Sequence, residues 1–392
     1  MKRHLLLLLA WTLLTVHATS ATRSRSNASD RKYAMYALAF YNQENLYDTI
    51  DDPLTNDRDF LPTGTYGWNT MKYQAKIHNM STVLSQIATD KGLKYGPAVI
   101  GLAEVENRQV CLDLTQSPAL RDRGYRVLHY DSPDRRGIDC ALLYNPRLFH
   151  LEDSLYVHCI TPLPGSDDWL GFEQTPATRR IKARPLHGDK SHPTRGFLVG
   201  IGTMAGEKMA IIVCHWPSRG AESYVRERAA RQVKQLIEAL QLQYPGIKVV
   251  TMGDLNDDPD NKSLKQAMAC CYKPSEVKAD GDIFNPWLHT LRHIGQGSLL
   301  YDGEWNLFDQ ILVTGNMVDR RMRLGKTKPR MSSMILTGGL TYYFNEVFIR
   351  DYMVTQEGRY KGGPKRTTSG GVWQNGYSDH YPTCIYLVKE GK

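Results

Sequence analysis

The chain has 392 residues, which is long for one ordinary domain and sufficient to bury a large hydrophobic core. Hydrophobic residues make up 41% of it and charged residues 23%, as is typical of a globular protein and not of a disordered chain. The formal net charge of +8, from 49 Lys and Arg against 41 Asp and Glu, favours a polyanionic partner over a cationic one.

The segment 1–21 has the pattern of a secretory signal peptide. Basic residues precede an apolar run at 5–16, and Val16 and Ala18 fit a small-x-small cleavage site. The run is shorter than the roughly twenty residues that span a bilayer. No Cys follows it, which argues against a lipid anchor. We therefore expect a secreted, periplasmic or extracellular protein without stable membrane insertion after cleavage; an uncleaved anchor is the alternative.

The cysteines do not dominate the predicted fold. There are seven, so at least one is unpaired or pairs between chains. None has C-x-x-C spacing, and we expect no zinc site and at most one or two disulfides. Cys140, Cys214 and Cys384 lie in apolar, strand-like runs, where a buried thiol behaves as a small hydrophobe.

After a polar linker at 22–32, residues 33–392 are predicted to form one domain in which strands alternate with a few helices. Helical periodicity predicts helices over 72–89 and 222–241. Strands are predicted, in chain order, at 36–42, 97–105, 138–145, 209–216, 247–254, 308–314 and 380–388. This order favours a mixed α/β sandwich over a purely parallel wound sheet.

A basic insertion is predicted near 319–370. Residues 319–366 hold eleven Lys or Arg against four acidic residues, and the Gly, Pro and Ser of 361–371 indicate a mobile loop. The segment is either a solvated surface loop or an arm that meets polyanions. Within it, LTYYFNEVF (340–348) is either an exposed apolar hairpin suited to a membrane lipid or an inserted strand pair.

The stretch KVVTMGDLNDDPD (248–260) places four carboxylates and an amide directly after a β-branched strand. A calcium loop is excluded, because Pro259 stands where the sharp turn needs Gly and Lys265 where a bidentate Glu is required. Asp254 follows the strand at the kind of strand end where ligand sites gather. The stretch therefore predicts part of an active site.

Other strand ends carry the same kinds of side chain. They are Asn42 with Glu44, Glu104 with Glu106, His215 with Arg219, Asp309, and Asp379 with His380. Each alone is more often structural, but together they indicate one site. Arg136, Gly137 and Asp139 form either a tight turn with an internal ion pair or a part of that site.

These motifs resemble the endonuclease/exonuclease/phosphatase superfamily, which includes deoxyribonucleases, apurinic-site endonucleases, inositol-polyphosphate phosphatases and neutral sphingomyelinases. Their order matches from Asn42 to Pro382, and GDLN and SDH are the most specific pieces. FYNQENLYDTIDDP, RRGIDCALLY and HWPSR are similar to a secreted bacterial branch. The resemblance implies an α/β, four-layer sandwich of two packed mixed β-sheets flanked by helices, with the site at one edge.

The resemblance also implies a role for each residue. It assigns a divalent metal, Mg²⁺ with Mn²⁺ or Ca²⁺ as substitutes, to Asn42, Glu104 and Asp379, with Glu44 as a supporting carboxylate. Its catalytic residues are Asp254 and Asn256 for the attacking water and a phosphate oxygen, His380 beside the scissile phosphate, Asp309 behind that imidazole, and His215 facing the phosphate. Glu106 competes with Glu104 for the metal, and Glu104 is preferred because the strand ends there.

The chemistry needs these residue types. A hard cation on oxygen ligands neutralises charge that develops on a phosphodiester, and an Asp behind an imidazole favours the imidazolium. We expect a monomeric, secreted, metal-dependent nuclease cleaving extracellular DNA or RNA, with Arg219, Lys361, Lys365 and Arg366 contacting substrate. The alternatives are a phospholipid or sphingomyelin phosphodiesterase or a phosphomonoesterase on the same fold, and a non-catalytic nucleic-acid-binding protein. HWPSR argues against abasic-site specialisation.

Overall fold

The computed structural model describes residues 33–160, 171–176, 179–184, 194–326, 328, 334 and 338–391. The predicted signal peptide and the linker lie outside the described residues, so both stay predictions. Residues Lys32–Lys392 form one compact unit. In the described part of the chain, no helix combines the length and the apolar character needed to cross a membrane.

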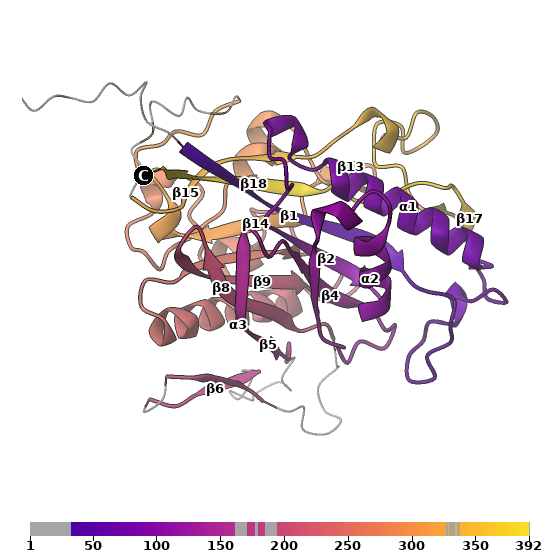
Figure 1. Cartoon of the computed structure of the whole chain (residues 1–392), viewed down its shortest axis with the longest axis horizontal. Coiled ribbons are helices and arrows are strands. Elements are labelled where there is room, and N and C mark those ends of the chain that lie inside the picture. The colour runs from indigo at the N-terminus through magenta and orange to yellow at the C-terminus, as the bar shows by residue number, and fades with distance from the viewer. Residues whose placement is uncertain are drawn as a thin grey trace, which may run out of the picture. The chain divides into compact units, whose positions relative to one another are not determined.

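Two six-stranded sheets carry the fold (Figure 1). The first has the order β15–β18–β1–β2–β4–β3. Its strands are β1 (Tyr33–Leu46), β2 (Val99–Val105), β3 (Arg126–His129), β4 (Asp139–Tyr144), β15 (Thr341–Val347) and β18 (Thr383–Glu390). Only β1 and β2 run parallel in this sheet, and the other neighbours are antiparallel.

The second sheet has the order β11–β14–β10–β9–β8–β5. Its strands are β5 (Phe149–Val157), β8 (Phe197–Met204), β9 (Glu207–His215), β10 (Lys248–Asp254), β11 (Ile283–Phe284) and β14 (Asp309–Thr314). Here β9 and β10 are the parallel pair. Three two-stranded sheets complete the described strands: β6 (Phe172–Gln174) with β7 (Ile181–Ala183), β12 (Leu299–Tyr301) with β13 (Glu304–Asn306), and β16 (Thr368–Ser369) with β17 (Val372–Trp373).

The two large sheets pack face to face through an apolar core. Gly101 of β2 lies so close to β10 that an added Cβ would meet Met252 Sδ at 2.6 Å. Val213 of β9 and Ile311 of β14 belong to the same buried cluster as the strands of the first sheet. Strands buried on both faces read as continuous apolar runs, which is why β1, β2, β9 and β10 are recognisable in the sequence.

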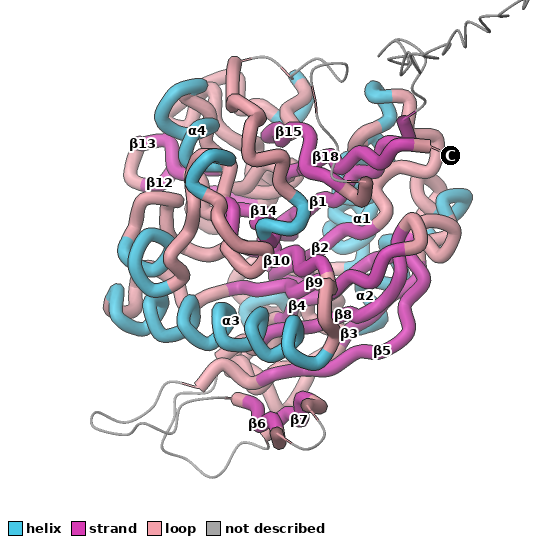
Figure 2. The backbone as a smooth tube through the Cα atoms, turned by 90° about the vertical axis from the view of Figure 1, so that its left-hand side faces the viewer, coloured by secondary structure: helices cyan, strands magenta, loops and turns pink. Residues whose placement is uncertain are grey.

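Helices cover the outer faces. They are α1 (Thr70–Gln86), α2 (Arg108–Gln116), α3 (Ser223–Gln243) and the short α4 (Trp287–His289). The side chains of Asn69 and Asn107 accept backbone N–H groups at the starts of α1 and α2. In Figures 1 and 2, α3 runs along the second sheet, while α1 and α2 lie on the side of the first. The predicted α/β sandwich of two mixed sheets flanked by helices is confirmed.

The prediction for 340–348 was wrong, and 361–371 has more contacts than its composition indicates. Residues 341–347 form β15, a single edge strand paired with β18, and Tyr342 is fully buried. They are neither an exposed hairpin nor a strand pair. In 361–371, backbone hydrogen bonds join Lys365 N to Met353 O at 2.7 Å and Tyr377 N to Lys365 O at 2.7 Å, and the end of the segment enters the hairpin β16–β17. The segment is therefore tied to its neighbours and is not an open loop.

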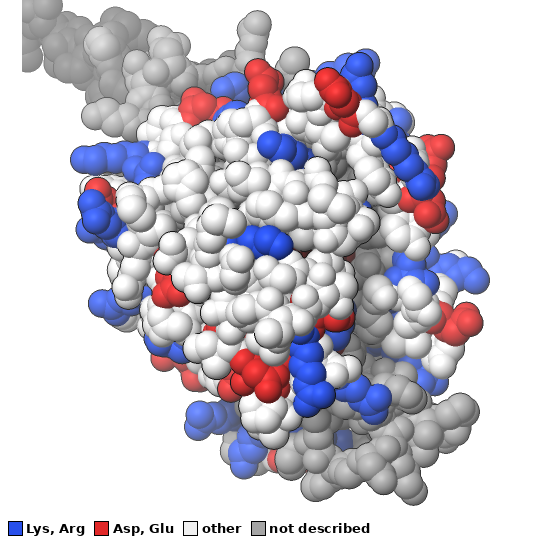
Figure 3. Space-filling view, turned by 90° about the vertical axis from the view of Figure 1, so that its right-hand side faces the viewer, with Lys and Arg blue, Asp and Glu red and all other residues white. Residues whose placement is uncertain are grey.

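The basic segment is not one cationic arm. Arg320, Arg321 and Arg350 form ion pairs with Asp280, Asp319 and Asp90. On the face drawn in Figure 3, basic side chains lie apart, with acidic ones between them. The surplus charge of the segment is therefore spread over separate, partly neutralised places.

Gly253 offers a test of the packing between β9 and β10. An added Cβ there would lie 2.2 Å from the backbone O of Cys214, so the two strands would have to move apart. We expect Gly253→Ala to lower the free energy of unfolding by about 1–3 kcal/mol, measured by denaturant titration. Gly220→Ala is the matched control, because its Cβ would make an ordinary 3.5 Å contact with Ser218 Oγ. Equal stability of the two variants would contradict the close approach.

Candidate active site

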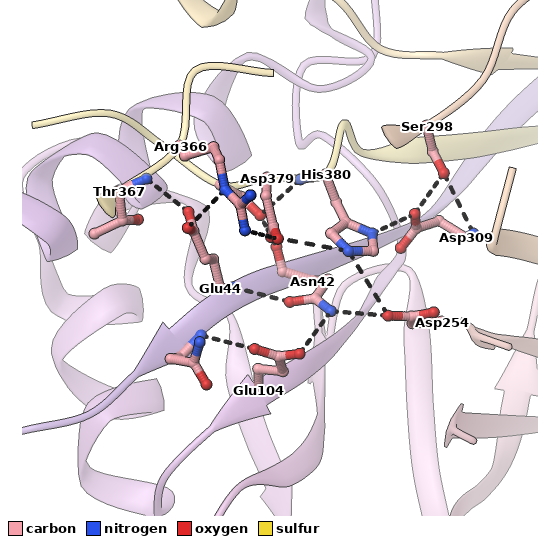
Figure 4. A network of polar contacts seen from close by, with 12 residues as sticks. Asn42, Glu44, Glu104, Asp254, Ser298, Asp309, Arg366, Thr367, Asp379 and His380 are labelled. Atoms are coloured by element: carbon pink, nitrogen blue, oxygen red, sulfur yellow. Dashed lines mark hydrogen bonds and ion pairs between the residues drawn. The ribbon is translucent and has the colours of Figure 1, made fainter. Parts of the chain in front are cut away.

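The ends of strands from both sheets meet at one edge. In the second sheet, Asp254 at the end of β10 pairs in register with His215 of β9 on one side and with Asp309 of β14 on the other. In the first sheet, Asn42 of β1 pairs with Ala103, and Glu104 follows directly on β2. The topology therefore brings residues 42, 104, 215, 254 and 309 to the same edge, as Figure 4 shows for four of them.

Bulges and strained backbone direct these side chains. The β1–β2 register shifts between Asn42 and Leu46, and the β2–β4 register shifts between Ala103 and Val105. Glu104 has φ of 60° in the left-handed region, which is uncommon for a residue with a side chain. Glu44 has φ of 47° and Asn256 has φ of 51°. Such strain gathers at functional sites, where the surrounding structure over-determines the backbone.

Asn42 joins the two sheets through its amide. Its Nδ2 donates to Glu104 Oε1 at 3.2 Å and to Asp254 Oδ2 at 3.0 Å, and its Oδ1 accepts the backbone N–H of Glu44 at 2.8 Å (Figure 4). The side chain is fully buried. A neutral amide here separates two carboxylates without adding charge.

The site opens as a cleft of about 490 Å³. Its lining includes acidic residues, two histidines and four arginines: Glu104, Asp254, Asp302, Asp379, His215, His380, Arg136, Arg195, Arg359 and Arg366. Asn256 also lines the cleft, whereas Asn42 and Asp309 are buried behind it. A cleft lined by both carboxylates and guanidinium groups suits an anion that is bound together with a cation.

His380 is held as a cation. Its Nδ1 lies 2.6 Å from Asp309 Oδ2, and its Nε2 lies 3.8 Å from Asp254 Oδ2. Burial would lower the pKa of His380, but the charges of Asp309, Asp379 and Asp254 outweigh burial and raise it well above the usual value. Ser298 Oγ donates to the same oxygen of Asp309. The imidazolium therefore has a fixed orientation, with Nε2–H directed toward the cleft.

His215 and Asp254 behave differently from His380. Burial, with Arg195, Arg136 and His380 nearby, lowers the pKa of His215 well below its usual value, so the imidazole is neutral. Burial raises the pKa of Asp254 to about 7, opposed by His380 and reinforced by Asp309. A carboxylate that titrates near neutral pH is suited to accept a proton.

A second group of charges lies beside the first. Arg366 Nη2 is 2.7 Å from Asp379 Oδ2, and its Nε is 3.4 Å from Glu44 Oε1. Burial and Asp379 raise the pKa of Glu44 to about 7, although Lys76 and Arg366 oppose the shift. Burial lowers the pKa of Lys76 to about 8. Lys76 Nζ donates to Thr367 Oγ1 and to the backbone O of Tyr377, which ties α1 to the loop that carries Asp379.

The donor set fits a divalent cation. Single ligand atoms of Glu104, His215 and Asp254 all lie within 4.8 Å of one another, and His215 Nε2 is 3.8 Å from each of the two carboxylates. Carboxylate oxygens with a neutral imidazole are suitable ligands for such an ion. Asp254, Asp309 and His380 form a second close group, but its imidazole is protonated and cannot bind a metal.

The predicted metal residues occupy different positions around this group. Glu104 belongs to it, and Asn42 donates to both of its carboxylates. Asp379 and Glu44 are instead engaged by Arg366. Glu106 lies outside the cleft, in a separate acidic cavity with Asp48, and its Oε2 accepts the backbone N–H of Asp48.

The structure places two of the predicted substrate contacts away from the cleft. Arg219 does not line the cleft. It donates to Asn256 O, Asp258 Oδ2 and Asn306 Oδ1 of neighbouring loops, and its guanidinium lies 4.2 Å from the Phe308 ring centroid. Lys361 is exposed and lines neither the cleft nor the adjoining cavity. Lys365 lines that adjoining cavity, and Arg366 lines both.

Sequence reasoning missed several residues of the site. Arg195 is buried and donates to Asp134 Oδ2 at 2.8 Å and to Trp216 O at 3.1 Å while lining the cleft. Arg359 and Lys76 were also missed, and Arg136 was left between two interpretations although it lines the cleft. Arg195, Arg359 and Lys76 belong to no strand-end motif, so no local signal distinguished them from surface cations.

A sequence model of the endonuclease/exonuclease/phosphatase family matches residues 37–166 and 177–389. The chain belongs to this family. Membership confirms the resemblance inferred from the motifs and makes the protein a hydrolase of phosphoester bonds; the bacterial branch stays a prediction. No curated protein matches the chain in sequence.

Solved structures agree with the family fold. An endonuclease/exonuclease/phosphatase family protein from Bacteroides thetaiotaomicron is 14% identical, with 92% of this chain and 96% of that chain covered and a TM-score of 0.50. A mannosyl-6-phosphatase from the same organism is 14% identical, with 90% of this chain and 99% of that chain covered and a TM-score of 0.49. A humanized TDP2 of D. rerio is also 14% identical, with 90% of this chain and 98% of that chain covered and a TM-score of 0.47. At this identity the likeness to the first structure establishes the fold alone.

The two neighbouring glutamates give a matched test of cation binding. Glu104→Gln removes a carboxylate from the cleft group, and we expect it to weaken Mn²⁺ binding, measured by calorimetry, by at least about tenfold. Glu106→Gln is the control and should bind Mn²⁺ as the wild type does, because Glu106 faces another cavity. The reverse result, with Mn²⁺ binding lost in Glu106→Gln and unchanged in Glu104→Gln, would show that Glu106 and not Glu104 binds the cation.

Proposed function

We propose that the protein is a divalent-metal-dependent phosphodiesterase that cleaves nucleic acid. The observation that carries the proposal is the buried His380–Asp309 pair, with His380 Nε2 3.8 Å from Asp254 Oδ2, in a cleft lined by four arginines. A phosphodiester is an anion, and this cleft presents fixed cations to its oxygens and a proton acceptor near its phosphorus. The bound cation would supply neutralisation of charge on the phosphate, held by Glu104 with Asp254 and His215.

The chain's own residues divide the remaining work. Asp254 accepts the proton of the attacking water, which it orients together with Asn256. His380 stabilises the negative charge that develops on the phosphoryl oxygens, and Asp309 keeps the ring charged and oriented. Arg195 and Arg366, which also line the cleft, hold the anionic substrate.

Two alternatives lose support. A lipid substrate was favoured by an exposed apolar hairpin at 340–348, and that segment is a strand of the first sheet. A non-catalytic binding protein would lack part of the reactive set, whereas Glu104, Asp254 and His380 are all present and lie together. Secretion is part of the proposal on the pattern of residues 1–21 alone, and sequencing the N-terminus of the mature protein tests it.

The His380–Asp309 pair predicts that kcat falls strongly when one carboxylate oxygen of Asp309 is replaced by an amide nitrogen. Asp309→Asn keeps the shape of the side chain but removes the charge that holds His380 protonated, and we expect kcat on DNA to fall by about 10²–10⁴-fold. The fall should be accompanied by a pH–rate profile displaced to lower pH. Asp122→Asn, at a side chain that is 94% exposed, is the control. If Asp309→Asn has the kcat and pH profile of wild type, protonated His380 has no part in the mechanism.

A substrate panel tests the proposed activity. Single-stranded DNA, plasmid DNA, bis-p-nitrophenyl phosphate and p-nitrophenyl phosphate are incubated with Mg²⁺, and again with EDTA. We expect both DNA substrates and the diester to be cleaved only with the metal, and the monoester at least about a hundredfold more slowly, as loss of matched transition-state contacts allows. Rapid hydrolysis of the monoester with intact DNA would favour a phosphomonoesterase and contradict the proposal.

A further inference from the structure

A second cavity opens directly beside the catalytic cleft. It has a volume of about 790 Å³, and it is lined entirely by residues of the segment 351–377. Arg359, Tyr360 and Arg366 line both this cavity and the cleft, so the two spaces adjoin. The volume lies within the range of about 300–1,000 Å³ that is usual for small-molecule sites. A substrate whose phosphate lies in the cleft therefore has room for a bulky group here.

Three tyrosine rings give the cavity aromatic walls. Tyr352 and Tyr377 lie with ring centroids 5.1 Å apart at 50°. The Tyr352 hydroxyl donates to Gln86 Oε1 at 3.0 Å, which fixes that ring from outside the cavity. At the mouth, the guanidinium groups of Arg359 and Arg366 lie 5.7 and 6.0 Å from the Tyr360 ring centroid. All three rings are half-buried, so part of each remains available to a ligand.

The polar groups of the cavity are placed for a flat, hydrogen-bonding ligand attached to an anion. The ammonium group of Lys365 has no partner among the described residues, and Arg359 has only its contact with Tyr360. Gln356 and Gln374 donate through Nε2 to backbone oxygens, and their Oε1 atoms have no partner within the described part of the chain. Aromatic faces, amide groups and free cations in one space are poorly suited to a lipid chain.

We propose that this cavity is the subsite for the nucleobase of the nucleotide whose phosphate is cleaved, stacked on Tyr352 and Tyr377, with the ammonium group of Lys365 donating to the base. The inference rests on the proposed function. It adds the place where the base of the substrate binds, which is the cavity beside the cleft. Stacking of a base on an aromatic side chain is worth about 1–3 kcal/mol and tolerates every base, so the subsite selects nucleotides over other phosphate esters without reading sequence. Arg366, held by Asp379 and Glu44, forms the border between the subsite and the catalytic groups.

Two small diesters separate the subsite from the chemistry. Thymidine 5′-p-nitrophenyl phosphate carries a base, and methyl p-nitrophenyl phosphate has the same leaving group without one. With Mg²⁺, we expect wild-type kcat/KM to be at least about tenfold higher for the thymidine ester. Tyr352→Leu should lower kcat/KM for that ester about 5- to 100-fold, mainly through KM, and leave the methyl ester within about twofold of wild type. Lys365→Met should also lower kcat/KM for the thymidine ester, by a smaller factor than Tyr352→Leu does.

Matched controls lie elsewhere on the chain. Tyr224→Leu replaces an exposed tyrosine of α3, and Lys361→Met replaces an exposed lysine that lines neither space. Both should behave as wild type on both esters. A thermal midpoint within about 2 °C of wild type shows that the effect of Tyr352→Leu is not a loss of fold. If the midpoint falls further, the result for Lys365→Met decides whether the subsite exists.

The outcomes distinguish the subsite from the activity. The subsite is refuted if wild type shows no preference for the thymidine ester, or if Tyr352→Leu lowers kcat/KM equally for both esters. Either result leaves the proposed phosphodiesterase activity intact. If wild type cleaves neither ester with Mg²⁺ or Mn²⁺, the proposed function fails, and calorimetry with thymidine 5′-monophosphate against ribose 5-phosphate still decides the subsite. Tighter binding of the thymidine compound that disappears in Tyr352→Leu supports the subsite; equal binding of the two compounds overturns it.

Discussion

The repulsion among five carboxylates at one edge of the sandwich is the constraint on which the site depends. Glu44, Glu104, Asp254, Asp309 and Asp379 come from both sheets and from the loop before β18. Three of them (Glu44, Asp254 and Asp309) are buried and the other two are part-buried, in one connected network. Buried like charges are tolerated only when they are protonated or compensated. The protein uses both means, because the pKa values of Glu44 and Asp254 rise to about 7 and cations are placed against Asp309 and Asp379. The charge that remains in the cleft favours a divalent cation.

The fold supplies that compensation from distant parts of the chain. Arg366 and His380 both come from the C-terminal region, and they meet carboxylates that belong to β1, β10 and β14. The loop that carries His380 is attached to β1, because Ser378 Oγ donates to the backbone O of Asn42 and accepts the N–H of His380. The same loop continues from the tyrosine-lined cavity, so one segment forms the border of the substrate space and completes the catalytic group.

Local sequence rules predicted the strand-end residues but not the contacts between distant segments. The seven predicted strands and both predicted helices are present, because buried strands give continuous apolar runs and α1 and α3 have clear helical periodicity. Strand β8 was missed because Gly200 and Gly202 interrupt its apolar run, and α2 because it is short. Arg195 and Lys76 resemble surface cations in sequence, and their burial depends on long-range packing. Arg219 was misassigned because its position after His215 did not reveal that it stacks on Phe308.

The central claim is that the cleft between the two sheets, and no other acidic region, holds the catalytic cation. Anomalous diffraction from crystals soaked in Mn²⁺ tests it most directly, because the ion is located without reference to activity. The account predicts the strongest peak at bonding distance from Glu104, with Asp254 or His215 as a further ligand. A strongest peak in the acidic cavity lined by Asp48, Glu106 and Asp131, with none in the cleft, would contradict it.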